Sequence, residues 1–170
     1  KETKSAKIKE KKEEDCVTKS IHDASVGCIF FAVTNNGAYG KSLSGPIGSA
    51  YELQVSNKQE ISSSVLCEAY ETTYGDRDTT SILSNKLNLK QQFLRLDGQC
   101  KYGVVGAGAA EANLRLPKGG YQENIWDHVP GAHFVIEAGG KVTDLLGKNI
   151  DFSLGRKLSA NLTGIVSSNG

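Results

Sequence analysis

Residues 127–140 read Asp-His-Val-Pro-Gly-Ala-His-Phe-Val-Ile-Glu-Ala-Gly-Gly, and this stretch predicts the clearest helix of the chain. Asp127 is the expected N-cap, because a short acidic side chain can accept hydrogen bonds from the free amides of the first turn. Pro130 falls in that first turn, where its missing N–H does no harm. The two glycines at the end stop the helix. The expected buried stripe consists of Val135, Ile136 and Ala138.

Strand-like runs surround this helix and decide the fold class. Residues 26–33 read Val-Gly-Cys-Ile-Phe-Phe-Ala-Val, which predicts a strand that a Thr-Asn-Asn-Gly turn continues into a hairpin. Two more helices are predicted, one with Asp78 as its N-cap and one at residues 98–110. Strands alternating with helices indicate an α/β fold, a layered sandwich of a mixed β-sheet and α-helices. The other predicted strands are residues 51–55, 65–71, 93–96, 112–116, 142–145 and 163–167.

The composition is that of one globular domain and excludes several classes of protein. The chain has 170 residues, and 20 Lys+Arg against 19 Asp+Glu give a net charge of +1. A strongly basic nucleic-acid-binding protein is therefore excluded, and we expect no nucleic-acid partner. No apolar run reaches the roughly 18 residues of a membrane helix, and no signal peptide is recognised at the N-terminus. We therefore expect no membrane partner.

The four cysteines stand at positions 16, 28, 67 and 100, too far apart for a C-x-x-C redox pair or a zinc knuckle. Cys28 and Cys67 lie in apolar runs and are expected to be buried thiols that pack like small apolar residues. Such cysteine usage is typical of a reducing compartment. We expect a cytoplasmic location, with an organelle left open.

Residues 1–25 differ in composition from the rest of the chain. The first fifteen positions contain six Lys, four Glu and one Asp, with only Ala6 and Ile8 as apolar residues. Such a segment cannot bury enough surface to offset the entropy lost on ordering. We predict a charged flexible loop or linker at residues 1–25, followed by the folded domain at residues 26–170.

Three segments resemble a known family. Residues 121–128 read Tyr-Gln-Glu-Asn-Ile-Trp-Asp-His, residues 96–102 read Leu-Asp-Gly-Gln-Cys-Lys-Tyr, and residues 113–117 read Asn-Leu-Arg-Leu-Pro. Together with Glu-Ala-Gly-Gly at residues 137–140, they resemble the lithium-sensitive phosphomonoesterases related to inositol monophosphatase, in particular the 3'(2'),5'-bisphosphate nucleotidases of yeast and plant type. The resemblance implies that residues 26–170 form the second, C-terminal lobe of an αβαβα fold.

The resemblance also implies an activity and a cofactor. It implies Mg²⁺-dependent removal of the 3'-phosphate of 3'-phosphoadenosine 5'-phosphate, which leaves AMP, and similar action on 3'-phosphoadenosine 5'-phosphosulfate. Asp127 is implied as a catalytic residue and metal ligand, and Lys101 and Arg115 as contacts to the nucleotide phosphate. Gly98 and Arg77 are implied at substrate-binding positions, although the family usually has Ser and His there.

Less specific interpretations of the same residues stay open. Asp127 could be a helix cap only, Lys101 could extend from a helix to solvent, and Arg115 could end a surface strand. The family's Asp-Pro-x-Asp-Gly-Thr metal motif, moreover, does not occur in these 170 residues. We therefore expect an N-terminal half, on the same or a separate chain, as the partner that completes the enzyme, and no activity from this segment alone. The alternatives are a non-catalytic nucleotide-binding or assembly module and an inositol phosphate phosphatase.

Overall fold

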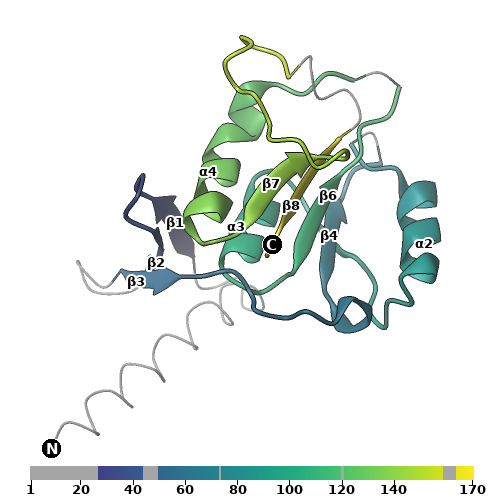
Figure 1. Ribbon diagram of the computed structural model, residues 1–170, viewed down its shortest axis with the longest axis horizontal. Helices are drawn as coiled ribbons and strands as arrows, with labels where there is room; N and C mark the ends of the chain where they lie inside the picture. The colour runs from purple at the N-terminus through teal and green to yellow at the C-terminus, as the bar shows by residue number, and fades with distance from the viewer. Residues whose placement is uncertain (1–26, 44–49, 73, 120, 159–163) are drawn as a thin grey trace, which may run out of the picture.

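The computed structural model describes residues 27–43, 50–72, 74–119, 121–158 and 164–170 (Figure 1). The predicted linker at residues 1–25 lies outside the described residues. None of the helices in the described part is long and apolar enough to cross a membrane.

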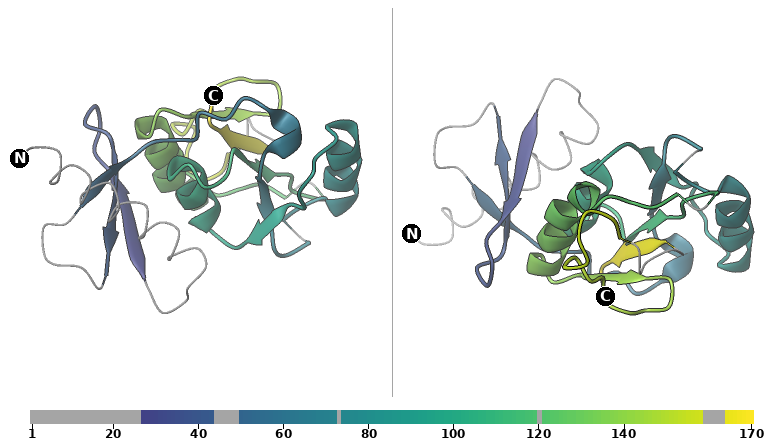
Figure 2. Two further views of the ribbon diagram at one scale, coloured as in Figure 1. Left: turned by 90° about the horizontal axis from the view of Figure 1, so that it is seen from below. Right: turned by 90° about the horizontal axis from the view of Figure 1, so that it is seen from above.

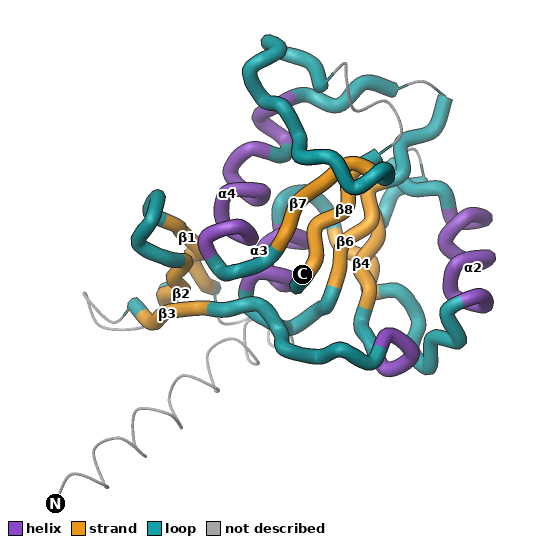
Figure 3. The backbone as a smooth tube through the Cα atoms, viewed as in Figure 1, coloured by secondary structure: helices purple, strands orange, loops and turns teal. Residues whose placement is uncertain are grey.

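A mixed five-stranded sheet forms the centre of the molecule (Figures 1 and 3). Its strand order is β5-β4-β6-β8-β7, with β4 parallel to both β5 and β6, and with β8 antiparallel to β6 and β7. The mixture follows from the connections, because helices join the parallel strands and β8 returns from the C-terminal part of the chain. The strands are β4 (Leu66–Ala69), β5 (Leu94–Leu96), β6 (Ala112–Arg115), β7 (Lys141–Asp144) and β8 (Ile165–Ser168).

A second, antiparallel sheet contains β1 (Cys28–Ala32), β2 (Ala38–Ser42) and β3 (Tyr51–Leu53) in sequence order. The β1–β2 hairpin is the one that the sequence predicts. Its turn needs left-handed backbone at Asn35 (φ 59°) and Gly37 (φ 88°), residue types that tolerate this conformation. The carboxylate of Glu137 accepts hydrogen bonds from the amides of both residues, at 3.1 and 3.2 Å. These hydrogen bonds attach the turn to the C-terminal end of the helix α4 (Val129–Glu137).

The helices are α2 (Arg77–Lys86), α3 (Cys100–Gly106) and α4 (Val129–Glu137), with short 3₁₀ turns η1 (Ile61–Ser63) and η2 (Ile125–Asp127). In Figure 2, α3 and α4 lie between the two sheets, and α2 lies on the opposite side of the five-stranded sheet. Contacts of α4 with β1 and β2 on one side and with β7 and β8 on the other agree with this order. These layers confirm the predicted α/β sandwich with a mixed sheet.

Two apolar cores hold the layers together. The larger core includes Cys67, Val105 and Val135 between the helices and the five-stranded sheet. The smaller one joins α4 to the three-stranded sheet, where the rings of Phe30 and Phe134 lie 5.5 Å apart. Burial raises the pKa of the Cys67 thiol to about 12, so this thiol stays neutral, as predicted for a buried cysteine. Cys28 is half-buried, not buried as predicted.

Helix ends differ from the sequence prediction. Asp127 ends η2 and His128 takes the N-cap position of α4, where no side-chain hydrogen bond within the described chain caps the helix. Asp76, not Asp78, caps α2, because its side chain accepts hydrogen bonds from the amides of Asp78 and Thr79. Ile136 was predicted to be buried, yet it is 52% exposed, because α4 buries only part of its surface.

Candidate active site

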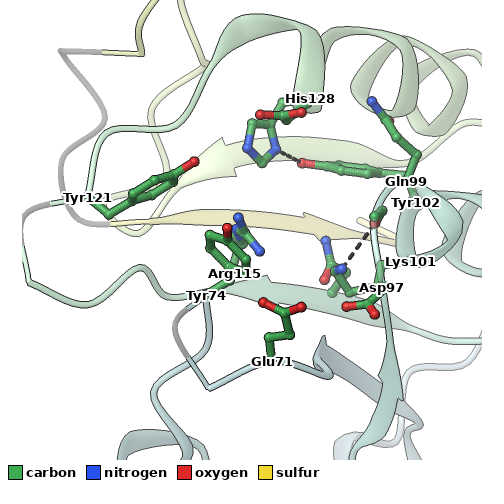
Figure 4. Close-up of a pocket in the computed structure, with 12 residues that line it drawn as sticks. Glu71, Tyr74, Asp97, Gln99, Lys101, Tyr102, Arg115, Tyr121 and His128 are labelled. Carbon is green, nitrogen blue, oxygen red and sulfur yellow. Dashed lines mark hydrogen bonds between the residues drawn. The ribbon is translucent and has the colours of Figure 1, made fainter.

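A pocket of about 240 Å³ opens where three parallel strands end (Figure 4). Because β4, β5 and β6 run in the same direction, their carboxyl ends meet at one edge of the sheet. Such an edge is the usual ligand-binding position in α/β folds. The lining residues lie in β6, in the segments after the three strands, in α3, at the end of η2 and at the N-cap of α4. They are Glu71, Tyr74, Asp97, Gly98, Gln99, Lys101, Tyr102, Asn113, Arg115, Tyr121, Asp127 and His128.

The pocket brings together four of the five residues that the sequence singled out. Gly98, Lys101, Arg115 and Asp127 all line it, although they are up to 29 residues apart in the chain. Arg77 does not line it. As the first residue of α2, Arg77 donates a hydrogen bond from its guanidinium to the carbonyl of Tyr70, 2.6 Å away. A role of Arg77 toward a ligand stays a prediction.

Lys101 reaches the pocket from the first turn of α3 and is buried. Its ammonium donates hydrogen bonds to the carbonyls of Leu96 at 3.1 Å and Gly98 at 3.0 Å. An ammonium has three N–H groups, so one donor is left for a ligand. Burial lowers the pKa of Lys101, and the positive charge of Arg115 lowers it further. A bound anion would oppose this lowering of the pKa, because negative charge favours the protonated ammonium.

Gly98 has a left-handed backbone with φ 51°, and a Cβ atom built there would meet nothing within 4 Å. This conformation favours glycine, which is the residue present. The open space beside Gly98 belongs to the pocket. A larger residue would therefore be limited by backbone strain and not by a clash.

Arg115 is the last residue of β6, and its guanidinium is held on two sides. Its Nε and Nη2 atoms donate hydrogen bonds to Glu123 at 2.6 and 3.0 Å, a paired geometry that fits the flat shapes of both groups. The guanidinium also lies 4.5 Å from the ring centroid of Tyr74. Arg115 is thus fixed in a wall of the pocket.

Glu123 is buried, and its side chain has a second partner in His128, whose Nε2 lies 3.1 Å from Oε2. Burial raises the pKa of Glu123, but the hydrogen bonds from His128 and Arg115 outweigh it and lower the pKa to about 2. On its other side, His128 Nδ1 lies 2.7 Å from the hydroxyl of Tyr102, as Figure 4 shows. Burial raises the pKa of Tyr102, which keeps this hydroxyl protonated.

Asp127 is exposed at the pocket rim, where its Oδ2 accepts a hydrogen bond from the Asn124 amide at 3.1 Å. Since α4 is not capped by this carboxylate, the cap interpretation of Asp127 loses its geometric basis. Oxygen ligands, carboxylates above all, suit Mg²⁺, so Asp127 fits as one ligand. Within the described ranges, however, no three His, Cys, Asp or Glu side chains are placed to hold a metal ion. The described residues therefore fit part of a metal site and not a whole one.

Several lining residues carried no assigned role in the sequence analysis. Tyr74 and Tyr121 pack edge to face with ring centroids 5.4 Å apart and give the pocket an aromatic wall. Tyr121 and His128 belong to the quoted segment at residues 121–128, and Tyr102 follows Lys101, so proximity to the motifs was a usable signal. Tyr74 had no such signal, because it stands alone in a polar loop.

A family model described as the inositol monophosphatase family matches residues 8–169. The chain belongs to this family. Among curated relatives, it is 39% identical over 151 residues to 3',5'-bisphosphate nucleotidase 2 of Arabidopsis thaliana, covering 89% of this chain and 42% of that protein. It is 40% identical over 145 residues to the 3'(2'),5'-bisphosphate nucleotidase of Oryza sativa, covering 85% and 39%. The chain thus spans about two fifths of these relatives and matches their C-terminal portion.

Solved structures confirm the fold of this inositol monophosphatase family member. SuhB of Mycobacterium tuberculosis superposes with a TM-score of 0.58 at 19% identity, covering 84% of this chain and 49% of that one. The inositol monophosphatase of Anabaena (Nostoc) sp. PCC 7120 gives a TM-score of 0.54 at 22% identity, covering 85% and 54%. The predicted membership of the family and the predicted fold are both confirmed.

Proposed function

We propose that this chain is the substrate-binding half of a Mg²⁺-dependent phosphatase that removes the 3'-phosphate of 3'-phosphoadenosine 5'-phosphate. The observation that supports it is the gathering of Lys101, Arg115 and Asp127 around one pocket at the carboxyl edge of the sheet. Two fixed cations and one exposed carboxylate suit a ligand that carries two phosphates and is held in part by a metal ion. The nucleotidase names of the relatives suggest the same substrate class.

In this proposal Asp127 supplies one metal ligand, and the N-terminal half of the enzyme, on the same or a separate chain, supplies the others. When bound, Mg²⁺ would polarise the phosphate and lower the pKa of a water molecule. Asp127 is exposed and lies just ahead of α4, whose N-terminus favours nearby negative charge such as a phosphate. Lithium inhibition is expected to follow from the family's metal chemistry.

Lys101 and Arg115 are proposed to bind the phosphate that is not cleaved. Arg115 offers directed N–H groups from a fixed plane, and Lys101 offers a charge that its two carbonyl partners hold in place. The phosphosulfate nucleotide would bind in the same way, because its 5' group is also anionic. Gly98 would leave room beside this group. Arg77 would act only through the loop that holds Tyr70.

A second candidate function is a non-catalytic nucleotide-binding or assembly module. The absence of a three-ligand metal group from the described residues favours it. An inositol phosphate phosphatase is a further alternative, and the two cations in the pocket count against it, because an inositol monophosphate has no second phosphate to bind.

The test is phosphate release from 3'-phosphoadenosine 5'-phosphate with Mg²⁺, measured for this chain alone and for the chain joined to the N-terminal portion of a nucleotidase relative. We expect no measurable turnover from the chain alone, since one carboxylate does not retain Mg²⁺ ions that normally need several oxygen ligands. We expect turnover from the joined protein, and none from the same protein with Asp127→Asn. Activity of the chain alone would contradict the half-enzyme proposal, and inactivity of the folded joined protein would favour the non-catalytic module.

A further inference from the structure

A buried chain of hydrogen bonds runs from α3 to the pocket wall. It connects Tyr102, His128, Glu123 and Arg115 through contacts of 2.7, 3.1, 2.6 and 3.0 Å. The first three residues are at most 3% exposed, and the Arg115 side chain is 13% exposed. Three segments of the chain, namely α3, β6 and residues 121–128, therefore meet in one polar network inside the fold.

The donors and acceptors of this network have one consistent order for a neutral His128. An ionised carboxylate can only accept, so His128 Nε2 must carry the hydrogen that faces Glu123. His128 Nδ1 then has a lone pair and accepts a hydrogen bond from the hydroxyl of Tyr102. Glu123 receives donors on both oxygens, with Arg115 Nε on Oε1 and with Arg115 Nη2 and His128 Nε2 on Oε2.

The network restrains Arg115 without using up its donors. A guanidinium has five N–H groups, and Glu123 accepts from two of them. The Tyr74 ring lies against one face of the guanidinium, with its centroid 4.5 Å from Cζ, and so restricts movement of the guanidinium out of its plane. The other N–H groups are held at a fixed place in the pocket wall that Arg115 forms.

We propose that Glu123, itself held by His128 and Tyr102, is a positioning residue that fixes the Arg115 guanidinium and thereby determines the selectivity for substrates with a second phosphate. This inference rests on the proposed function and assigns a role to residues that do not touch the phosphate. A preorganised donor loses less side-chain entropy on binding than one that must be ordered by the ligand. Glu123 thus acts on affinity through Arg115 and not on the cleaved phosphate.

A second buried glutamate, Glu68, is also paired with an arginine and provides a control. Arg95 Nε donates to Glu68 Oε1 at 2.8 Å, and Thr80 also donates to Glu68, at 2.7 Å. Glu68 is as buried as Glu123, with 2% of its side chain exposed, but it does not line the pocket. We expect loss of the Glu68 charge to perturb the fold and to leave Arg115 in place, because Glu68 has no contact with Arg115 among its hydrogen bonds.

The test compares kcat/KM for 3'-phosphoadenosine 5'-phosphate and adenosine 3'-phosphate in the joined protein. We expect Glu123→Gln to lower the first value about tenfold or more through KM and to change the second less than about threefold, following the cost of a charge-assisted contact. In an Arg115→Ala background, Glu123→Gln should have no further effect on the ratio of the two values. Glu68→Gln should leave the ratio unchanged in both backgrounds.

Equal losses on both substrates, or the same loss with and without Arg115, would overturn the inference and leave Glu123 a structural residue. A wild-type protein without preference for the second phosphate would contradict the proposed function instead. In that case the ¹H–¹⁵N signal of the Arg115 Nε–H group decides the positioning role. Slow hydrogen exchange of this group that becomes fast in Glu123→Gln supports the role, and exchange that is fast in the wild type or unchanged in the variant overturns it.

Discussion

Replacing Arg115 by Ala should destabilise the fold far more than a usual surface substitution does. The change removes two hydrogen bonds, at 2.6 and 3.0 Å, from a Glu123 side chain that is only 2% exposed. His128 remains as a partner, but the carboxylate loses the full positive charge beside it. Removing one member of a buried ion pair typically costs about 3–5 kcal/mol, and we expect a loss of unfolding free energy in this range.

The assay is urea unfolding of the protein that carries this chain, followed by circular dichroism for the wild type, Arg115→Ala and Arg95→Ala. Arg95 is the control because its side chain is 48% exposed and Glu68 keeps its bond to Thr80, so its loss should cost about 1 kcal/mol or less. Arg115→Lys keeps the charge without the paired geometry and should fall between the two. If Arg115→Ala destabilises the protein no more than Arg95→Ala does, then Arg115 does not stabilise the buried Glu123 carboxylate.

Three further predictions follow from the same structure. Asp127→Asn should abolish Mg²⁺-dependent turnover of the joined protein, a loss of several kcal/mol in transition-state stabilisation. It should shift the unfolding free energy by less than about 0.5 kcal/mol, because Asp127 is exposed and does not cap α4. A large loss of stability with the Mg²⁺ requirement intact would argue against the ligand role. Because the pKa of Glu123 is lowered from 4.5 to about 2, its ionised form stabilises the fold above pH 4.5, and this stability is lost as the pH falls toward 2. Between pH 5 and 2, the unfolding free energy should fall less steeply with pH in Glu123→Gln than in the wild type. Equal slopes would show that Glu123 does not contribute to acid stability. Gly106→Ala should lower the melting temperature and cost about 1–3 kcal/mol of stability, because the new Cβ would lie 2.4 Å from the Phe134 ring between α3 and α4. An unchanged melting temperature would mean that this contact can relax freely.

The elements themselves follow closely from local sequence. The run at residues 26–33 predicted a strand and hairpin, and the structure has β1 and β2 with the turn between them. The helix at residues 127–140 was also predicted, because its apolar positions recur at helical spacing. The N-cap of this helix and the exposure of its residues were not predicted correctly. A 3₁₀ turn precedes α4 and shifts the cap by one residue to His128, and the exposure of Ile136 depends on where the two sheets lie.

Site residues that belong to a sequence motif could be predicted, whereas those that only the fold brings to the pocket could not. Lys101, Arg115 and Asp127 belong to segments with a family resemblance, and the fold brings them to one pocket at the carboxyl ends of the parallel strands. The partner of Arg115 was not predictable, because Glu123 reaches it only after a loop folds back. Arg77 is the opposite case. It stands at a position where the resemblance implies a substrate contact, yet its guanidinium donates a hydrogen bond to the backbone carbonyl of Tyr70.

The proposed function requires that the pocket selects a substrate with two phosphates. The most direct measurement is the ratio of kcat/KM for 3'-phosphoadenosine 5'-phosphate to that for inositol 1-phosphate in the wild-type joined protein with Mg²⁺. In the proposed function, Lys101 and Arg115 would engage the second phosphate, which only the nucleotide carries, and a single charge-assisted contact is worth about tenfold to a hundredfold in binding. We expect a ratio of at least about ten. A ratio of one or below would contradict it and would favour an inositol phosphate phosphatase.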